Sequence, residues 1–180
     1  AIVNVPHPLL ELGLVIIDTP GLNAIGSEPE LTLNLIPSAH AVLFVLAADA
    51  GVTRTDIEIW RDHVTAAHRS GRFVVLNKID GLWDELKTEE EINREIASQV
   101  TSVGRLLDLP PERIYPVSAQ KALVGKIHED RALLARSRLP ELEFALSDEM
   151  IPQQQAIVRD QVRREFDETS GVTLSVLSAR

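Results

Sequence analysis

The sequence predicts an α/β fold with a mostly parallel sheet and flanking helices, for two reasons. Short apolar runs with the length of core strands lie at residues 14–17, 41–46, 73–76 and 114–117. Between the later runs lie segments in which apolar residues recur at helical spacing. An alternation of strands and helices along a chain is typical of parallel strands joined by right-handed crossovers.

The composition is that of an ordinary globular protein and argues against several functions. Hydrophobic residues make up 44% and charged residues 25% of the 180 residues, which is not the balance of a disordered chain. The formal charge of −9 disfavours a nucleic-acid-binding surface and direct adsorption to anionic lipid. The absence of cysteine fits a reducing cytosol, and no apolar run approaches the roughly 20 residues that span a bilayer. We therefore expect a cytoplasmic protein.

The first quarter of the chain is predicted to contain three strands and a short helix. Residues 2–5 form a short strand that ends at Pro6. Residues 14–18 form a strand covered on both faces, because four apolar residues in a row precede Asp18. A loop over residues 23–38 includes a short helix at 31–36, and residues 41–46 form the next buried strand.

Two further helices and two further strands follow. Thr55 and Glu58 form a predicted capping box, and the helix it starts ends before Gly71. Thr88 and Glu91 cap a second helix. The apolar stripes of these helices are Ile57, Trp60, Val64 and Ala67 in the first, and Ile92, Ile96, Val100, Val103 and Leu107 in the second. Residues 73–76 and 114–117 are the strands that precede and follow the second helix.

Helical segments are predicted from residue 119 to residue 166, and the composition changes near Ile151. The stretch PQQQAIVRDQVRREFDET is polar, with Val158, Val162 and Phe166 on one helical stripe. We therefore predict two domains, an α/β domain over residues 1–150 and a helical segment over residues 151–180.

Polar motifs follow three of the predicted strands at the point where each strand ends. DTPG follows the first at Asp18 to Gly21, NKID covers Asn77 to Asp80, and SAQ covers Ser118 to Gln120. Ligands of open α/β sheets bind at the carboxyl ends of the strands. We therefore expect these motifs to lie at one edge of the sheet, around a single ligand.

The NKID and SAQ motifs have the chemistry to bind a guanine base. The Asp80 carboxylate can accept hydrogen bonds from the ring N1–H and the exocyclic amino group, a donor pair that adenine lacks. Asn77 can tie neighbouring loops together, and the aliphatic stem of Lys78 can lie along the base. The backbone N–H near Ala119 can donate to the guanine carbonyl oxygen. Ser118 is equally explained as the N-cap of a helix.

The DTPG motif has the chemistry to bind the phosphate end of the same ligand. Asp18 can orient a water molecule bound to magnesium, and the N–H of Gly21 can contact a γ-phosphate. Taken alone, an Asp-Thr-Pro-Gly sequence after a strand is often only a turn. An Asn-Lys-x-Asp sequence after a buried strand is a better signal, and its alternative is a solvated Lys–Asp loop. The three motifs in this order are far more specific than any one of them.

These motifs resemble the third, fourth and fifth motifs of the G domain, the GTP-binding form of the P-loop NTPase fold. The segments DTPGLNAIGSEPELT, AVLFVLAADAGVTRTD and FVVLNKIDGLWDEL are similar to the dynamin superfamily, especially the bacterial dynamin-like GTPases. The resemblance implies a large GTPase that binds GTP or GDP with Mg²⁺, dimerises through its nucleotide face and remodels membranes through regions outside this chain. Residues 151–180 would then begin a neck or stalk bundle.

The chain departs from the G-domain pattern in two ways. The fifth motif has Gln120 where small GTPases usually have lysine, so no lysine role is assigned there. No G-x-x-x-x-G-K-[ST] phosphate loop is present, since Ser27 stands where the pair Gly21 and Gly26 would require lysine. Residues 1–17 also contain no threonine for a first switch. We therefore expect an N-terminally truncated G domain that is inactive alone, and assign no catalytic residue.

Two other functions share parts of this pattern. A ribosome- or RNA-associated GTPase can carry the same motifs, although the acidic charge disfavours it. A degenerate G domain can also be a non-catalytic scaffold. Trp83, just after NKID, is expected to pack at the start of the next helix rather than to stack on the base.

Overall fold

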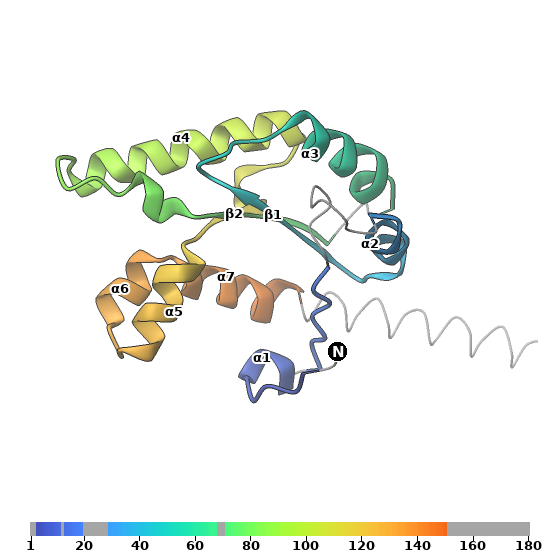
Figure 1. Cartoon of the computed structure of the whole chain (residues 1–180), viewed down its shortest axis with the longest axis horizontal. Helices are drawn as coiled ribbons and strands as arrows, with labels where there is room; N and C mark the ends of the chain where they lie inside the picture. The colour runs from blue at the N-terminus through green and yellow to red at the C-terminus, as the bar shows by residue number, and fades with distance from the viewer. Residues whose placement is uncertain (1–2, 12, 20–28, 68–70, 151–180) are drawn as a thin grey trace, which may run out of the picture. The chain divides into compact units, whose positions relative to one another are not determined.

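The computed structural model describes residues 3–11, 13–19, 29–67 and 71–150 (Figure 1). Two compact units divide the chain. One is Val15–Phe144, and the other joins Ala1–Leu14 with Ala145–Arg180. The predicted helical segment at 151–180 lies outside the described residues.

The larger unit is built on a parallel sheet with the strand order β1-β2-β3. β1 is Val42–Ala47, β2 is Arg72–Asn77 and β3 is Ile114–Pro116. Both pairings are parallel, and Val74 lies opposite Phe44 on one side and Ile114 on the other. The strands predicted at 41–46, 73–76 and 114–117 and the parallel sheet are therefore confirmed.

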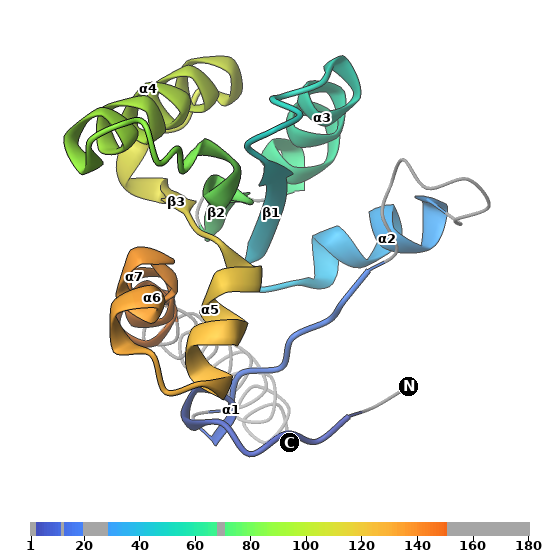
Figure 2. The same ribbon diagram turned by 60° about the vertical axis from the view of Figure 1, so that its left-hand side comes forward.

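Helices cover both faces of this sheet. α3 (Arg54–Ile59), its π-helical continuation η2 (Trp60–Thr65) and α4 (Glu89–Leu107) lie on one face, whereas α5 (Ala119–Ile127) and α6 (Arg131–Arg136) lie on the other (Figures 1 and 2). The remaining elements of the unit are α2 (Pro29–Leu35), η1 (Ile36–Ser38), η3 (Ile79–Leu82), η4 (Pro111–Arg113) and the beginning of α7 (Leu139–Ala145).

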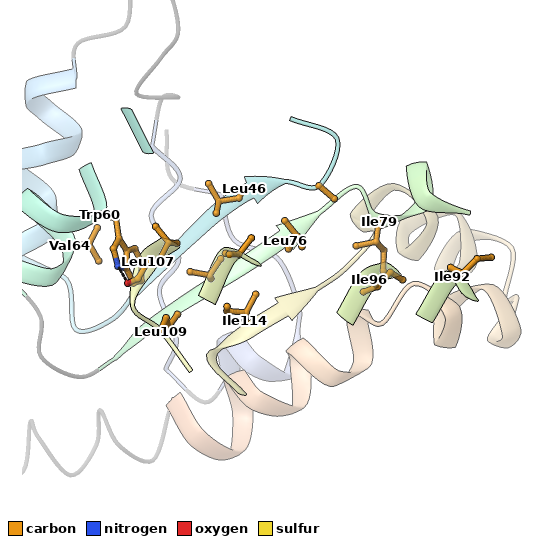
Figure 3. Packing of buried hydrophobic residues seen from close by; sticks show 13 residues of the cluster. Leu46, Trp60, Val64, Leu76, Ile79, Ile92, Ile96, Leu107, Leu109 and Ile114 are labelled. Carbon is orange, nitrogen blue, oxygen red and sulfur yellow. Dashed lines mark hydrogen bonds between the residues drawn. The ribbon is translucent and has the colours of Figure 1, made fainter. Parts of the chain in front are cut away.

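The main hydrophobic core lies between the sheet and the α3–α4 layer (Figure 3). Alternate strand residues such as Leu46, Leu76 and Ile114 meet the predicted apolar stripes of the two helices. The Trp60 indole donates a buried hydrogen bond of 2.8 Å to the carbonyl oxygen of Leu107, so the polar atom of this large ring is satisfied. The stripes predicted for α3 and α4 thus face the core, except that Ala67, the last residue of the first stripe, is exposed.

On the opposite face of the sheet, the side chains of the central strand β2 are buried, whereas those of the edge strand β1 are partly exposed. Phe73 is buried and its ring centre lies 6.2 Å from that of Tyr115 on the neighbouring strand. On β1, Leu43 is 40% and Val45 58% exposed. β1 pairs with β2 on one side only, and no other strand of the described chain pairs with it.

The prediction of a buried strand at residues 14–18 is wrong, because the described chain forms no strand there. Residues 14–19 form no regular secondary structure, and Val15, Ile16 and Ile17 are 81%, 68% and 60% exposed. An apolar run becomes a strand only where a partner supplies the ladder hydrogen bonds, and no described strand pairs with this run. The short strand predicted at 2–5 is also not formed over its described residues, 3–5.

The cap of α3 lies two residues earlier than predicted. Thr53 and Asp56 form the capping box, since the Asp56 N–H donates to Thr53 Oγ1 and the Thr53 N–H donates to Asp56 Oδ2. The sequence offers two overlapping T-x-x-acid patterns, and the earlier one starts the helix. Thr55 is therefore already helical, and Glu58 pairs instead with Arg54 at 2.8 Å.

The capping box of α4 is confirmed. The Thr88 N–H and hydroxyl donate to Glu91 Oε2 at 2.8 and 3.0 Å, and the Glu91 N–H donates to Thr88 Oγ1 at 3.3 Å. The hydrogen bond from the Thr88 backbone, followed by that from its hydroxyl, lowers the pKa of Glu91 below the ordinary value. The ionised form of Glu91 therefore stabilises the start of α4.

We expect this cap to weaken in acid. A carboxyl whose pKa is lowered by folding stabilises the folded state above its unfolded pKa, and this contribution is lost as the pH falls through the lower folded pKa. The Glu91→Gln variant should therefore lose less stability than the wild type when urea denaturation is repeated from pH 7 down to pH 3. Exposed Glu112→Gln is the control. Identical pH profiles for the wild type and Glu91→Gln would contradict the prediction.

The smaller unit is described in part. It contains α1 (Pro8–Glu11) and η5 (Leu146–Met150), and its buried apolar residues include Leu9, Leu14, Ala145 and Leu146. Among the residues that the structure describes, no helix combines the length and the apolar character needed to cross a membrane.

Candidate functional site

The ends of β2 and β3 are held together beyond the strands themselves. The Val117 N–H donates to the carbonyl oxygen of Leu76 at 2.9 Å, and the Ile79 N–H donates to that of Val117 at 3.3 Å. These bonds keep the loop after β2 in register with the loop after β3. The NKID and SAQ motifs therefore meet at one edge of the sheet.

Asn77 connects the ends of all three strands. Its side-chain oxygen accepts hydrogen bonds from the N–H groups of Lys78 at 2.8 Å and Ala119 at 3.1 Å. Its backbone carbonyl accepts a third, from Ala48 just after β1, at 2.8 Å. Asn77 is half-buried, and its three hydrogen bonds hold the loops after the strands next to one another.

Asp80 and Ser118 form the centre of the site. The Ser118 hydroxyl donates to Asp80 Oδ1 at 2.7 Å, and Ser118 Oγ also accepts from the Lys121 N–H at 3.2 Å as the N-cap of α5. Ser118 is thus the N-cap of α5 and at the same time a hydrogen-bond partner of the NKID loop. Ser118 is fully buried, whereas Asp80 is half-buried. Within the described chain, the Asp80 carboxylate accepts the Ser118 hydroxyl through Oδ1. Its other oxygen, Oδ2, can still accept hydrogen bonds.

Lys78 has a left-handed backbone, with φ 66° and ψ 32°, which is uncommon for a residue with a side chain. The Asn77 side chain holds its N–H, and its Nζ lies 3.3 Å from Asp49 Oδ2. Both members of this ion pair are more than half exposed, so the pair positions Lys78 more than it stabilises the fold. Sequence reasoning missed Asp49, although it too follows a strand end.

The structure does not join the other predicted residues to this cluster. Gln120 is exposed in the first turn of α5, and Asp18 is exposed in the unpaired segment at 14–19. Gly21 lies outside the described residues. In the part of the chain with described side chains, no three His, Cys, Asp or Glu residues are grouped to hold a metal ion.

Sequence reasoning also missed Ser137. Its carbonyl oxygen accepts the N–H of Ser118 at 2.9 Å, and both residues are fully buried. Ser137 lies 19 positions further along the chain, and its sequence surroundings carry no motif that points to the site. Only the path of the chain brings it there.

The fold and this cluster define the class of the protein. A parallel sheet with flanking helices, and an Asn-Lys-x-Asp loop that its asparagine and a serine hydroxyl tie to the next strand end, match the fold of a dynamin G domain. Asn77, Asp80, Ser118 and Ala119 are the residues that the structure brings together.

Comparisons with known proteins agree with this class. A profile of the Dynamin family matches residues 1–79. A bacterial dynamin-like protein of Nostoc punctiforme is 25% identical over 165 residues, which are 82% of this chain and 23% of that protein. The "Probable transmembrane GTPase FZO-like, chloroplastic" of Arabidopsis thaliana is 33% identical over 123 residues, 68% of this chain and 13% of that protein.

A solved structure has the same fold. LeoA, a bacterial dynamin GTPase from ETEC, matches with a TM-score of 0.51 and 19% identity over 76% of this chain and 27% of that one. The family profile and these relatives make the chain similar to the dynamin superfamily. This chain spans about a third or less of the length of the curated relatives that it matches.

Proposed function

We propose that this chain is the guanine-reading part of a dynamin-like GTPase that hydrolyses GTP to remodel membranes. The single observation that carries the proposal is the hydrogen bond of 2.7 Å from Ser118 to Asp80. It fixes a half-buried carboxylate at the sheet edge and leaves it able to accept the two N–H donors of guanine. An adenine would leave this carboxylate without those donors, which costs affinity.

The neighbouring residues complete the base pocket. Lys78, ordered by Asn77 and Asp49, would lay its aliphatic stem along one face of the base. Ser118, Ala119 and Gln120 would form the far wall. The Ala119 N–H is already bonded to Asn77, so its role toward the guanine carbonyl oxygen requires a shared hydrogen bond.

The phosphate end is proposed from sequence motifs alone. Asp18 would hold a water molecule of a bound Mg²⁺, and the Gly21 N–H would contact the γ-phosphate. Magnesium would neutralise charge on the phosphates. The residues that cradle the phosphates in a P-loop are absent from these 180 residues, so they would come from another part of the polypeptide.

The partners follow from the family. The names of two relatives describe dynamin-like or FZO-like proteins, and the proposed protein would likewise self-associate as a homodimer across its nucleotide face and act on membranes through regions outside this chain. The charge of −9 supports a function without nucleic acid. Peripheral membrane association would then accompany a cytoplasmic location.

The proposal is tested by comparing the full-length protein with residues 1–180. The full-length protein with Mg²⁺ should hydrolyse GTP and leave ATP almost untouched, and lipid vesicles should change its rate. Residues 1–180 alone should not bind GTP with a Kd below about 1 μM in calorimetry, because most of the phosphate contacts are missing. A full-length protein that binds neither nucleotide would overturn the proposal in favour of a scaffold.

A further inference from the structure

The corner between α6 and α7 contacts both chain segments that carry the guanine-reading side chains. Arg136 ends α6, and its guanidinium carbon lies 4.3 Å from the centre of the Trp83 ring. Its Nη2 lies 2.6 Å from Glu89 Oε1 at the start of α4. Trp83 directly follows η3, the short helix that contains Asp80. Arg136 therefore holds the loop that leaves the Asp80 segment at two points.

The next residue of the corner holds the other segment. The Ser137 carbonyl accepts the Ser118 N–H at 2.9 Å, and the Ser118 hydroxyl donates to Asp80 at 2.7 Å. The Ser137 side chain is itself fixed, because its hydroxyl donates to the carbonyl of Leu134. Two adjacent residues of one corner thus contact both segments. Arg136 contacts Trp83, which follows the Asp80 segment, and Ser137 accepts the backbone N–H of Ser118.

A third contact makes the corner rigid. Arg138 has a left-handed backbone with φ 58°, and its Nη2 lies 2.5 Å from the Asn93 side-chain oxygen on α4. Backbone in this region persists only where surrounding contacts hold it. Arg136, Ser137 and Arg138 therefore act as one block that docks onto the start of α4 and onto the site.

The planar guanidinium of Arg136 is the group that makes the contact with the Trp83 ring. Its side chain is 40% and that of Glu89 63% exposed, so the ion pair alone contributes little. Stacking on an indole ring adds a contact that depends on a flat cation, and lysine does not reproduce it fully. Trp83 is half-buried and packs against the core, so it is a fixed platform for this contact.

We propose that Arg136 is a positioning residue for guanine recognition, which holds Asp80 against Ser118 in the orientation that the base requires. This inference rests on the proposed function of the site. Arg136 does not touch the base. It acts through Trp83 and, with Ser137, through the hydrogen bond between Ser118 and Asp80.

The test measures GDP and IDP binding to the full-length protein by calorimetry. Hypoxanthine lacks the exocyclic amino group, so IDP makes one hydrogen bond fewer to Asp80. Arg136→Gln should raise the Kd for GDP about two- to fivefold and the Kd for IDP less, so that the preference for GDP falls. Arg136→Lys should lie between Arg136→Gln and the wild type. Exposed Arg54→Gln, which removes a similar surface ion pair, should change neither Kd.

An equal rise for both nucleotides, or none, would overturn the proposal, since a general loosening of the fold would not distinguish the amino group. If Arg136→Gln does not fold by circular dichroism, Arg136→Lys carries the test, because it keeps the charge and loses the planar group that stacks on Trp83. Its preference for GDP over IDP should fall by up to about twofold, and an unchanged preference would overturn the proposal. A wild-type protein that does not prefer GDP to ADP would instead refute the proposed function.

Discussion

Replacing Asp80 with asparagine should lower the affinity for GTP at least about 100-fold and raise that for XTP by about tenfold or more. Guanine presents N1–H and amino donors, and a carboxylate accepts from both. Asparagine offers one acceptor and one donor, so its amino group would face that of guanine. Xanthine carries a carbonyl oxygen at this position and matches asparagine. Calorimetry or displacement of a fluorescent nucleotide on the full-length protein measures both changes.

The matched control for this change is Asp62→Asn. Asp62 is an exposed residue of η2 whose carboxylate pairs with its neighbour Arg61 at 2.7 Å. It should leave both affinities unchanged. If Asp80→Asn weakens GTP and XTP equally, Asp80 stabilises the loops without reading the base, and the assignment of guanine recognition to this residue fails.

Shortening Leu76 to alanine should destabilise the fold by about 2–5 kcal/mol. Leu76 is fully buried at the centre of the sheet, directly before Asn77, and belongs to the cluster shared by the sheet and α4. Removal of its side chain leaves a cavity where three strands and two helices meet. Urea denaturation of residues 1–180, followed by circular dichroism, gives the change in free energy of unfolding.

Leu86→Ala makes the same chemical change in a different place. The Leu86 side chain is 95% exposed, so its loss should alter stability by less than about 0.5 kcal/mol. A loss below about 1 kcal/mol for Leu76→Ala would show that the centre of the sheet is not closely packed. Because both variants replace leucine with alanine, the difference between their free energies of unfolding reports the effect of burial alone.

The sequence predicted those parts of the fold that depend on neighbours along the chain. The α4 cap at Thr88 needs only residues three apart, and the apolar stripe that ends at Leu107 needs only a helical period. β1, β2 and β3 were found because each short apolar run lies between helical segments. The same reasoning placed NKID and SAQ at one sheet edge, where the structure joins them.

The failures have a different origin. The run at 14–17 has the composition of a core strand, but Ile16 is 68% exposed because no described strand pairs with it. At α3, two overlapping capping patterns compete, and a single sequence does not rank Thr53 above Thr55. Neither outcome follows from local composition.

The sequence by itself determined which side chains gather at this sheet edge, because Asn77, Asp80 and Ser118 directly follow predicted strand ends. Only the tertiary structure decided what holds them in place. Arg136 and Ser137 reach the site through a change in chain direction between two short helices, and Asp49 reaches Lys78 across a strand pairing. Contacts between residues far apart in the chain depend on how the helices and strands pack, so they cannot be predicted from the residues next to them in the sequence.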